Sequence, residues 1–400
     1  MCYTQNRFNA LLSASVLSLI ATAGWSQSLT WLGVLPGGGS SYAYGVSANA
    51  VVVGGANNAA GRGRAFRWQN GVMQDLGTLG GDRSAARGVS ADGAVVVGVA
   101  LNAGGQWRAF RWQNGVMQNL GTLGGNESDA RGVSADGAVV VGWALNDANQ
   151  QRAFRWTASG GMQALGTLGG NRSEAYGVSA DGAVVVGWAE NAAGQRRAFR
   201  WTASGGMQDL GTLGGNWSEA YGVSADGAVV VGVALNAGGR IRAFRWTALG
   251  GMQDLGMRYA DGVSADGSVV VGESGERAFR WTASGGMEDL NTTYASLLTP
   301  GSVLREARAI SPDGRYIVGS GYNAATGRRE AFLLDTGSPR CTAHDGDVDA
   351  NGCVDDADLL AVLFAFGSTG STLGREDANC DGAVDDADLL QVLFHFGSGC

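Results

Sequence analysis

The sequence predicts an all-β protein, a seven-bladed β-propeller whose first and last strands pair to close the ring, followed by a small α-helical domain. Three observations predict this fold class: a repeat of about 44 residues, four short strand patterns in each repeat, and two chain ends that are each an incomplete repeat. The 68 glycines among the 400 residues fit the many tight turns of such a fold.

The repeat is marked by the pentapeptide Arg-Ala-Phe-Arg-Trp. Its six copies end at Trp68, Trp112, Trp156, Trp201, Trp246 and Trp281. The intervals are 44, 44, 45, 45 and 35 residues, and a degenerate seventh copy spans residues 330–334. We expect the aromatic residues to fill the core between blades, and the second arginine to stack on an aromatic ring or pair with an acid.

Each period contains four strand patterns, which in one copy are residues 175–179, 183–187, 197–201 and 206–210. The second pattern is a run of valines, and β-branched residues favour strands. Asp181-Gly182, between the first two patterns, is a strong hairpin-turn signal. The period does not show the 3.6-residue repeat of a helix.

The two chain ends are complementary. Residues 29–35 match the fourth strand of the repeat, and residues 331–334 match the third. The N-terminal piece therefore supplies one strand and the C-terminal piece three, which together complete a seventh blade. Such closure protects sheet edges that an open array leaves exposed. An open β-solenoid is the alternative, and it has no need of complementary ends.

One end of the propeller is predicted to vary. The connections after the first and third strands are nearly constant between copies, whereas those after the second and fourth differ. In an up-and-down blade these two variable connections lie at the same end. We therefore expect any ligand at this face and at the mouth of the central channel. The candidate ligand-binding residues are Arg83, Glu127, Arg172, Trp217 and Trp107.

The repeats offer little catalytic chemistry, and we predict no catalytic residues. Both histidines, His344 and His395, lie after the last repeat, so a histidine-based triad is excluded from the propeller. Two carboxylates could still hydrolyse a glycoside. The acids at the least regular positions are Glu127, Glu174, Glu219 and Glu306. Residues 1–340 hold 24 acids and 27 arginines, so no nucleic-acid partner is expected.

The N-terminus has the pattern of a signal peptide. Arg7 precedes an apolar stretch over residues 10–20, and Ala21-Thr22-Ala23 follows as a cleavage site. The stretch is too short to span a membrane. We therefore expect a secreted protein, located outside the cell or on its surface.

After removal of residues 1–26, four cysteines remain, all within residues 341–400. An even number in an exported chain indicates two disulfides. The pairs are either Cys341–Cys400 with Cys353–Cys380, or Cys341–Cys353 with Cys380–Cys400. Zinc is the alternative, which the absence of a Cys-x-x-Cys motif disfavours.

Residues 341–400 hold 12 acids and one arginine, arranged as two loops over residues 347–358 and 377–388. Both place oxygen ligands at loop positions 1, 3, 5, 9 and 12, a carbonyl at position 7 and glycine at position 6, the pattern of a calcium loop. The ligands of the two expected Ca²⁺ ions are Asp347, Asp349, Asn351, Cys353, Asp355 and Asp358, and Asp377, Asn379, Asp381, Ala383, Asp385 and Asp388.

An apolar run follows each loop, over residues 359–366 and 389–396. We expect these runs to form two short helices that pack on each other. Because the crowded carboxylates repel one another without the metal, folding of this part should depend on calcium.

Residues 341–400 resemble dockerin type I repeats, which carry Asp at loop position 12 followed by a leucine-rich helix. The resemblance implies calcium binding and docking onto a cohesin-like partner. It also implies that loop positions 10 and 11 help to select that partner, in two symmetry-related modes. These positions are Asp356 and Ala357, and Asp386 and Ala387.

The repeats are similar to the HAF-type extracellular repeat family, through Arg-Ala-Phe-Arg-Trp, Leu-Gly-Thr-Leu-Gly-Gly and Gly-Val-Ser-Ala-Asp-Gly-Ala-Val-Val-Val-Gly. That similarity implies secretion and a repeat fold. The expected organisation is a signal peptide over 1–26, a propeller over 27–336, a linker over 337–340 and a dockerin-like domain over 341–400.

The leading hypothesis for function is a secreted, non-catalytic binding or scaffold propeller for a glycan or protein ligand, tethered through the calcium-dependent module to a cell-surface or extracellular partner. A carbohydrate-active enzyme, either a glycoside hydrolase or a lyase, is the first alternative. A purely structural matrix protein is the second. Carboxylates that converge at the channel mouth would favour the enzyme, and exposed Trp and Arg there would favour binding.

Overall fold

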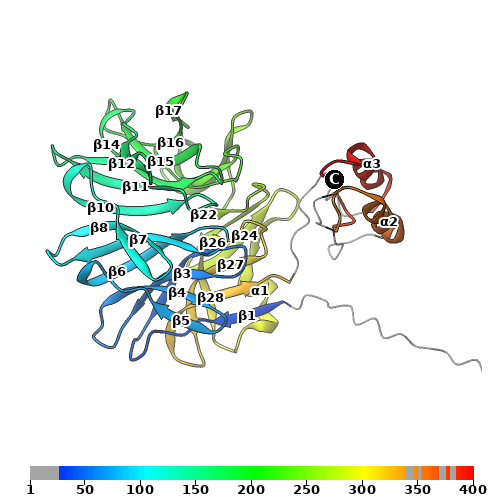
Figure 1. Cartoon of the computed structure of the whole chain (residues 1–400), viewed down its shortest axis with the longest axis horizontal. Helices are drawn as coiled ribbons and strands as arrows, with labels where there is room; N and C mark the ends of the chain where they lie inside the picture. Colours follow the sequence, from blue (N-terminus) through cyan, green and yellow to red (C-terminus); the bar gives the residue numbers. More distant parts are fainter. Residues whose placement is uncertain (1–26, 338–345, 350–352, 369–374, 379–383) are drawn as a thin grey trace, which may run out of the picture.

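A computed structural model describes residues 27–337, 346–349, 353–368, 375–378 and 384–400. The expected signal peptide and linker residues 338–340 lie outside these ranges. Residues 28–335 form seven four-stranded antiparallel sheets, the blades of a propeller (Figure 1). The seven-bladed architecture predicted from the repeat is therefore confirmed.

The strands of the blades follow the repeat. Blade 1 comprises β2 (Ser41–Val46), β3 (Val52–Asn57), β4 (Gly63–Gln69) and β5 (Val72–Asp75); blade 2, β6 (Gly80–Val89), β7 (Val95–Asn102), β8 (Trp107–Gln113) and β9 (Val116–Asn119); blade 3, β10 (Gly124–Val133), β11 (Val139–Asn146), β12 (Gln151–Thr157) and β13 (Gly161–Ala164). Blade 4 comprises β14 (Gly169–Val178), β15 (Val184–Asn191), β16 (Arg196–Thr202) and β17 (Gly206–Asp209); blade 5, β18 (Gly214–Val223), β19 (Val230–Asn236), β20 (Ile241–Thr247) and β21 (Gly251–Asp254); blade 6, β22 (Tyr259–Val263), β23 (Val269–Ser274), β24 (Arg277–Thr282) and β25 (Gly286–Asp289). Two short helices, α1 (Leu290–Thr293) and η1 (Ala295–Leu297), lead into blade 7.

Blade 7 is built from both ends of the chain. Its strands are β26 (Val303–Ile310), β27 (Tyr316–Asn323) and β28 (Arg328–Asp335), and β1 (Ser28–Trp31) adds the fourth strand next to β28. The register pairs Ser28 with Asp335 and Trp31 with Phe332. This is the closure predicted from the complementary chain ends.

The core lies between the blades. One cluster joins Val53 and Ala65 of blade 1 to Ala86, Val96 and Phe110 of blade 2, and all five are inaccessible to solvent. The pentapeptide Phe is fully buried in this way at Phe66, Phe110, Phe154, Phe199, Phe244 and Phe332. The expected aromatic core between blades is therefore confirmed.

The glycine that ends each valine run is required by this packing. A Cβ on Gly98 would overlap the Ala85 carbonyl and touch the Phe110 ring. The second strand can approach both the first strand and the buried ring only because this position has no side chain.

A serine in each of several first strands joins neighbouring blades. Ser84 of blade 2 accepts a hydrogen bond from the Ala65 N–H of blade 1 at 2.9 Å and donates one to the Gly77 carbonyl at 2.6 Å. We call this pair of bonds the serine link. Further serine links are made by Ser128, Ser173 and Ser218.

A serine link also crosses the closure. Ser41 accepts from the Ala331 N–H of β28 at 2.9 Å and donates to the Gly33 carbonyl at 2.5 Å. Ser41 and Ala331 are 290 positions apart in the chain. The same motif that joins consecutive blades therefore fastens the two ends of the ring.

The turns after the first strands form a second connection around the ring. The Ala48 N–H donates to the Ala91 carbonyl, and the series continues through Ala135, Ala180, Ala225 and Ala265 to the Pro312 carbonyl, at 2.8–3.1 Å. Pro312 has no N–H, so it cannot donate the seventh bond, to Ala48. Since each turn contacts its neighbour, this face is constrained to the constant sequence that the repeats show.

The second arginine of the pentapeptide mostly makes a different contact from those expected. Arg67, Arg111, Arg155, Arg200 and Arg245 each donate from Nε to a carbonyl in the Asp-Gly turn of the next blade, at 3.0–3.4 Å. Arg280 does pair with an acid, Glu288, at 2.5 Å. The prediction that this arginine contacts an aromatic ring or an acid is therefore wrong for five of the six copies. The reason is that the turn of the next blade presents a backbone carbonyl to the guanidinium.

The C-terminal part contains the two expected helices, α2 (Asp356–Ala365) and α3 (Asp386–His395), which contact each other (Figure 1). Each begins with a capping box, formed by Asp355 with Asp358 and by Asp385 with Asp388. Valines from both loops and both helices form a small core, Val348, Val354, Val362, Val384 and Val392. The small helical domain is therefore confirmed.

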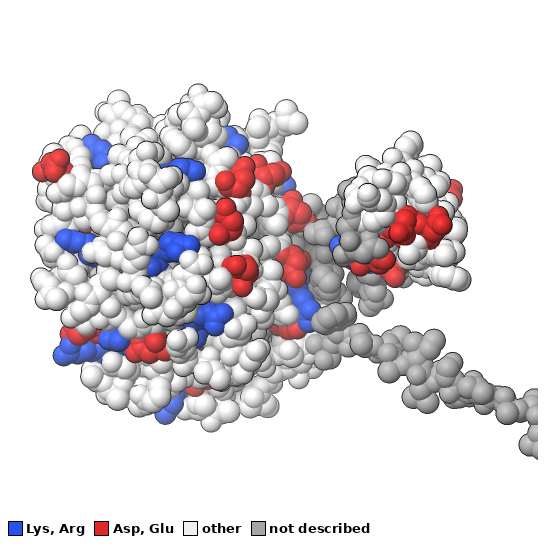
Figure 2. Space-filling model, viewed as in Figure 1, with Lys and Arg blue, Asp and Glu red and all other residues white. Residues whose placement is uncertain are grey.

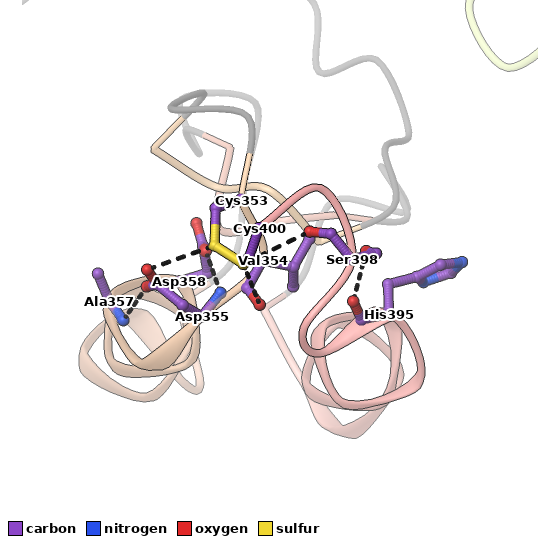
Figure 3. The surroundings of a disulfide bond; sticks show 8 residues. All are labelled: Cys353, Val354, Asp355, Ala357, Asp358, His395, Ser398 and Cys400. Atoms are coloured by element: carbon purple, nitrogen blue, oxygen red, sulfur yellow. Dashed lines mark hydrogen bonds between the residues drawn. A yellow bond between two sulfur atoms is a disulfide. The ribbon is translucent and has the colours of Figure 1, made fainter.

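A disulfide joins Cys353, before α2, to Cys400, after α3 (Figure 3). Neither pairing expected from the sequence contains this bond, so both are wrong for these two cysteines. The reason is backbone pairing, because Val354 donates to the Ser398 carbonyl at 3.0 Å and accepts from the Gly397 N–H at 2.8 Å. Cys341 and Cys380 lie outside the described residues. None of the helices in the described part of the chain is long and apolar enough to cross a membrane.

The serine link at the closure gives a test of what holds the ring together. Replacing Ser41 with Ala leaves the buried Ala331 N–H without its acceptor, so Ser41→Ala should lower the free energy of unfolding by about 1–3 kcal/mol. Urea unfolding followed by tryptophan fluorescence measures the loss.

Ser84→Ala is the matched control, because it removes the same bonds between two blades that the chain already joins covalently. Ser41→Ala should cost at least as much as Ser84→Ala. A wild-type unfolding midpoint for Ser41→Ala would contradict the role of this link in closure.

Candidate functional site

The innermost strand of every blade sends one side chain into the central channel from the same position of the repeat. We call these seven residues the channel ring: Tyr44, Arg87, Arg131, Tyr176, Tyr221, Asp261 and Arg308. They come from β2, β6, β10, β14, β18, β22 and β26. The ring is chemically diverse, although the residues around it in the repeat are nearly constant.

A β-bulge lies at every position of the channel ring. In blade 2, for example, Ala86 pairs with Gly98 and Gly88 pairs with Val97, so Arg87 has no partner of its own. The same register shift occurs in the other six blades. Bulges redirect side chains beside functional sites, and here they turn one residue per blade toward the axis.

The channel ring lines a cavity of about 300 Å³ together with Tyr259. A second cavity of about 210 Å³ shares four ring residues with it and is lined mainly by the glycines and valines that follow the ring. The channel is therefore charged and aromatic at the ring and aliphatic toward the constant turns. Its volume lies at the lower end of small-ligand sites.

Carboxylates behind the ring hold its arginines. Arg131 pairs with Asp129 at 3.4 Å and with Glu174 at 2.9 Å, and Arg87 approaches Asp129 at 3.7 Å. Arg308 pairs with Glu306 at 2.5 Å and with Asp261 at 3.3 Å. We call Asp129, Glu174, Glu219 and Glu306 the outer carboxylates, because each comes two residues before a ring residue and all four are buried, with exposed fractions of 5–6%.

Tyrosines complete the ring. The guanidinium of Arg87 lies 5.5 Å from the Tyr44 ring centre, and that of Arg131 lies 5.6 Å from the Tyr176 ring centre. Tyr176 and Tyr221 meet edge to face at 5.3 Å. Burial raises the pKa of each of these three tyrosines, so their hydroxyls stay protonated and can donate hydrogen bonds near neutral pH.

Several polar atoms in this site are buried and make no hydrogen bond to the described protein. They are the Nε atoms of Arg87, Arg131 and Arg308, Oδ1 of Asp129 and Oδ2 of Asp261. Buried polar groups in folded proteins are nearly always hydrogen-bonded. Four of these five atoms belong to residues that line the cavity, so the channel concentrates incompletely paired polar groups.

The acids of the site differ in their proton affinity. Burial raises the pKa of Asp261 to about 7, against the opposing effect of Arg308. Burial also raises the pKa of Glu174, which Arg131 only partly offsets. For Glu306 the pairing with Arg308 and Arg329 and the hydrogen bond from Ser320 outweigh burial, so its pKa is lowered.

Four of the five candidate ligand residues of the variable face lie in strands that also carry the channel ring. Arg83, Glu127, Arg172 and Trp217 each come four residues before a ring residue, and Trp107 begins β8. Arg172 is exposed and pairs with Glu190 at 2.6 Å, whereas Glu127, Trp217 and Trp107 are half-buried. None of the five lines the described cavity.

The channel ring was missed by the sequence prediction, although a signal for it exists. In Ser-x-Ala-x-Gly-Val-Ser both x positions vary while the other positions stay nearly fixed. Of the acids considered for hydrolysis, Glu174, Glu219 and Glu306 are outer carboxylates, whereas Glu127 is not. Variation inside an otherwise constant strand indicated the site more directly than variation in the loops.

The first acidic loop brings three of its expected ligands together. Carboxylate oxygens of Asp347, Asp349 and Asp358 lie within 4.8 Å of one another. Cys353 and Asp355 lie in the described part of the same loop, and Asp377, Asp385 and Asp388 in that of the second. Asn351, Asn379, Asp381 and Ala383 lie outside the described residues. Hard oxygen donors of this kind suit Ca²⁺.

No protein-family model matches this chain, and no curated protein matches it. The HAF-type and dockerin resemblances therefore have no support from a family model. Among solved structures, the chain is similar to TolB from Acinetobacter baumannii, with 14% identity and a TM-score of 0.44 over 72% of this chain and 64% of that one.

The extracellular domain of BT4673 from B. thetaiotaomicron is 12% identical, with a TM-score of 0.49 over 77% of this chain and 39% of that one. Puromycin hydrolase is 16% identical, with a TM-score of 0.47 over 74% of this chain and 54% of that one. The chain thus spans less than two thirds of each of these three proteins. The propeller assignment rests on the strand topology described above.

The raised pKa of Asp261 predicts a pH-dependent stability difference. Because its folded pKa of about 7 exceeds the ordinary 3.8, the folded protein keeps a proton that the unfolded chain has lost, and this stabilisation falls as pH rises toward 7. Asp261→Asn lacks this titration. Its stability relative to wild type should rise between pH 5 and 7, by up to about 3 kcal/mol, and then level off.

Urea unfolding at intervals from pH 5 to pH 8 measures this difference. Ser84→Ala, which removes no ionisable group and lies outside the cavity lining, is the control and should give a flat difference over the same range. A flat difference for Asp261→Asn as well would contradict a raised pKa.

Proposed function

We propose that this is a secreted binding protein whose propeller holds a small polar ligand in the central channel and whose C-terminal domain docks onto an extracellular partner. The observation that carries the proposal is the set of seven bulges that direct varied polar and aromatic side chains into one cavity, where four of the lining residues each have a buried polar atom without a hydrogen-bond partner. A glycan is the ligand class that this mixture of tyrosine faces and charged hydrogen-bonding groups fits best.

A purely structural role is less well supported by the channel. Burying ion pairs is costly, and replacing them with apolar residues is often neutral or stabilising. A ring that served only to close the propeller could be filled by aliphatic residues, as the adjoining strand positions are at Val46, Val89 and Val133. Arginines, acids and tyrosines at the bulged positions instead favour recognition.

Binding can be tested with the full chain on a glycan array and with soluble glycans. Tyr176→Ala should weaken binding by at least about 10-fold, because truncating a central aromatic contact commonly costs more than 1 kcal/mol. Tyr322→Ala is the control, since Tyr322 lies on β27, is 39% exposed and does not line the cavity. Equal affinity in both variants would contradict a ligand site in the channel.

The channel also supports a second candidate, a glycan-cleaving enzyme. Asp261, with a pKa of about 7, suits a general acid near neutral pH, and Glu306 pairs with the same arginine, Arg308. Chromatography of the glycans bound on the array distinguishes the two. A binding protein leaves their chain length unchanged, whereas shortened products that disappear in Asp261→Asn would favour the enzyme.

The C-terminal domain is proposed to be the dockerin-like docking module. Helices α2 and α3 expose equivalent apolar residues, Leu360 and Leu390, Leu363 and Leu393, Phe364 and Phe394, and Phe366 and Phe396. The neighbouring Asp356, Ala357, Asp386 and Ala387 are exposed as well. Two equivalent apolar surfaces support a cohesin-like partner that binds in two symmetry-related ways.

Calcium is proposed to stabilise this module, with one ion in each loop. Titration calorimetry of the full chain should give two Ca²⁺ ions, and a chelator should reduce the helical circular dichroism and the thermal stability. Asp358→Asn and Asp388→Asn should each remove one ion, because position 12 supplies a ligand of each loop.

Asp356→Asn is the matched control for this prediction. It also removes an acid from the first turn of α2, but its side chain is exposed and is not among the proposed ligands. Helical signal that survives the chelator unchanged would contradict calcium-dependent folding, whatever the outcome of the glycan tests.

A further inference from the structure

We propose that the channel ligand carries an oxyanion, a carboxylate or a sulfate, and that Arg87, Arg131 and Arg308 bind it. This inference rests on the proposed function, because it names the chemical class of the ligand at the same site. It is carried by three features of the channel: the charge that lines the cavity, the fixed arginines and the tyrosines beside them.

Arginines outnumber acids among the residues that line the cavity. For comparison, Figure 2 shows both acids and arginines over one outer face of the molecule. Of the eight residues that line it, three are arginines and one, Asp261, is an acid. The four outer carboxylates do not line the cavity. Asp129, Glu174 and Glu306 pair with ring arginines, whereas Glu219 pairs with Arg196. A ligand in the cavity therefore meets guanidinium groups first, with their paired carboxylates behind them. Such a lining favours an anion over a cation.

The arginines are held in position before any ligand arrives. Terminal nitrogens of Arg131 and Arg308 are bound to carboxylates at 2.5–3.4 Å, and Arg87 lies over Tyr44. Nε of all three arginines is buried and donates no hydrogen bond within the described protein. Guanidinium groups that carboxylates hold from behind suit a carboxylate or sulfate oxygen in the cavity.

The tyrosines indicate that the anion is part of a ring-bearing molecule. Four of the eight lining residues are Tyr44, Tyr176, Tyr221 and Tyr259. Their rings offer apolar surface to a sugar ring. A cavity of about 300 Å³ has room for a small acidic sugar rather than for a protein segment.

Titration calorimetry of the full chain at fixed ionic strength tests this inference with three probes. D-Galacturonate offers a carboxylate on a sugar ring, D-galactose is the same ring without the carboxylate, and sodium sulfate offers a free oxyanion. We expect galacturonate to bind at least 10-fold more tightly than galactose. Sulfate binding alone would also support the oxyanion site and would identify a free anion as its source.

Arg87→Gln is the principal variant, because Arg131 still neutralises Asp129 in it. It should weaken anion binding by about 10- to 100-fold, the value of a charge-assisted hydrogen bond. Arg131→Lys is the second variant, since it keeps the charge that Asp129 and Glu174 need but loses the forked donor. Arg328→Gln, an exposed arginine that does not line the cavity, is the control and should bind as wild type does.

Two results would overturn the inference: galactose binding as tightly as galacturonate, or anion binding that neither channel variant weakens. Absence of binding by both anions at 10-fold the concentration that saturates an array-selected glycan would do so as well. In each case a neutral glycan whose binding requires Tyr176 would leave the proposed binding function standing. The experiment therefore distinguishes an incorrect ligand class from an incorrect binding site.

Discussion

Strand β1 lies along β28 and completes the seventh blade, so that a chain of consecutive hairpins becomes a ring. Without this pairing, blade 7 would have three strands and β28 would present an open edge. The serine link from Ser41 to Ala331 and Gly33 fastens the same junction. The central channel exists only in the closed ring, because its seven lining positions come from seven different blades. Every functional proposal made for the propeller depends on this junction.

The innermost strand of each blade has a constant part, which holds the propeller together, and a variable part, which lines the channel. At one end, the Asp-Gly turns hydrogen-bond to one another and accept from the pentapeptide arginines, which leaves little freedom for substitution. A few positions earlier in the chain, the bulged position has no strand partner, and its side chain is free to vary. The same strand therefore supplies a rigid frame and a variable site. This division explains how repeats of nearly constant sequence can build one chemically asymmetric cavity.

The C-terminal domain is a short acidic segment that folds around a small apolar core. Five valines make up that core, and the capping boxes of α2 and α3, the Cys353–Cys400 disulfide and the backbone pairs at Val354 and Val384 add to it. Domains this small commonly need such additional constraints. The clustered Asp347, Asp349 and Asp358 fit the view that a metal ion is one of them.

Local patterns in the sequence determined much of this protein. The period of the pentapeptide predicts seven blades, the chain ends predict their closure, and the spacing of acids after residue 346 predicts two loops followed by two helices. These features depend on residues that are close together in the chain, so they can be predicted from the sequence. The candidate ligand residues Arg83, Glu127, Arg172 and Trp217 lie in strands that also carry the channel ring, but each is four residues away from the ring residue that lines the cavity.

Only the tertiary structure decided which residues meet. The position of each bulge depends on how two strands pair, and the cavity depends on seven strands that are about 44 residues apart in the chain. The partner of the pentapeptide arginine is a turn carbonyl of the next blade, and a carbonyl leaves no mark in the sequence. The Cys353–Cys400 bond likewise follows from the pairing of Val354 with Gly397 and Ser398. In each case the deciding contact joins distant backbone groups, which side-chain patterns alone do not encode.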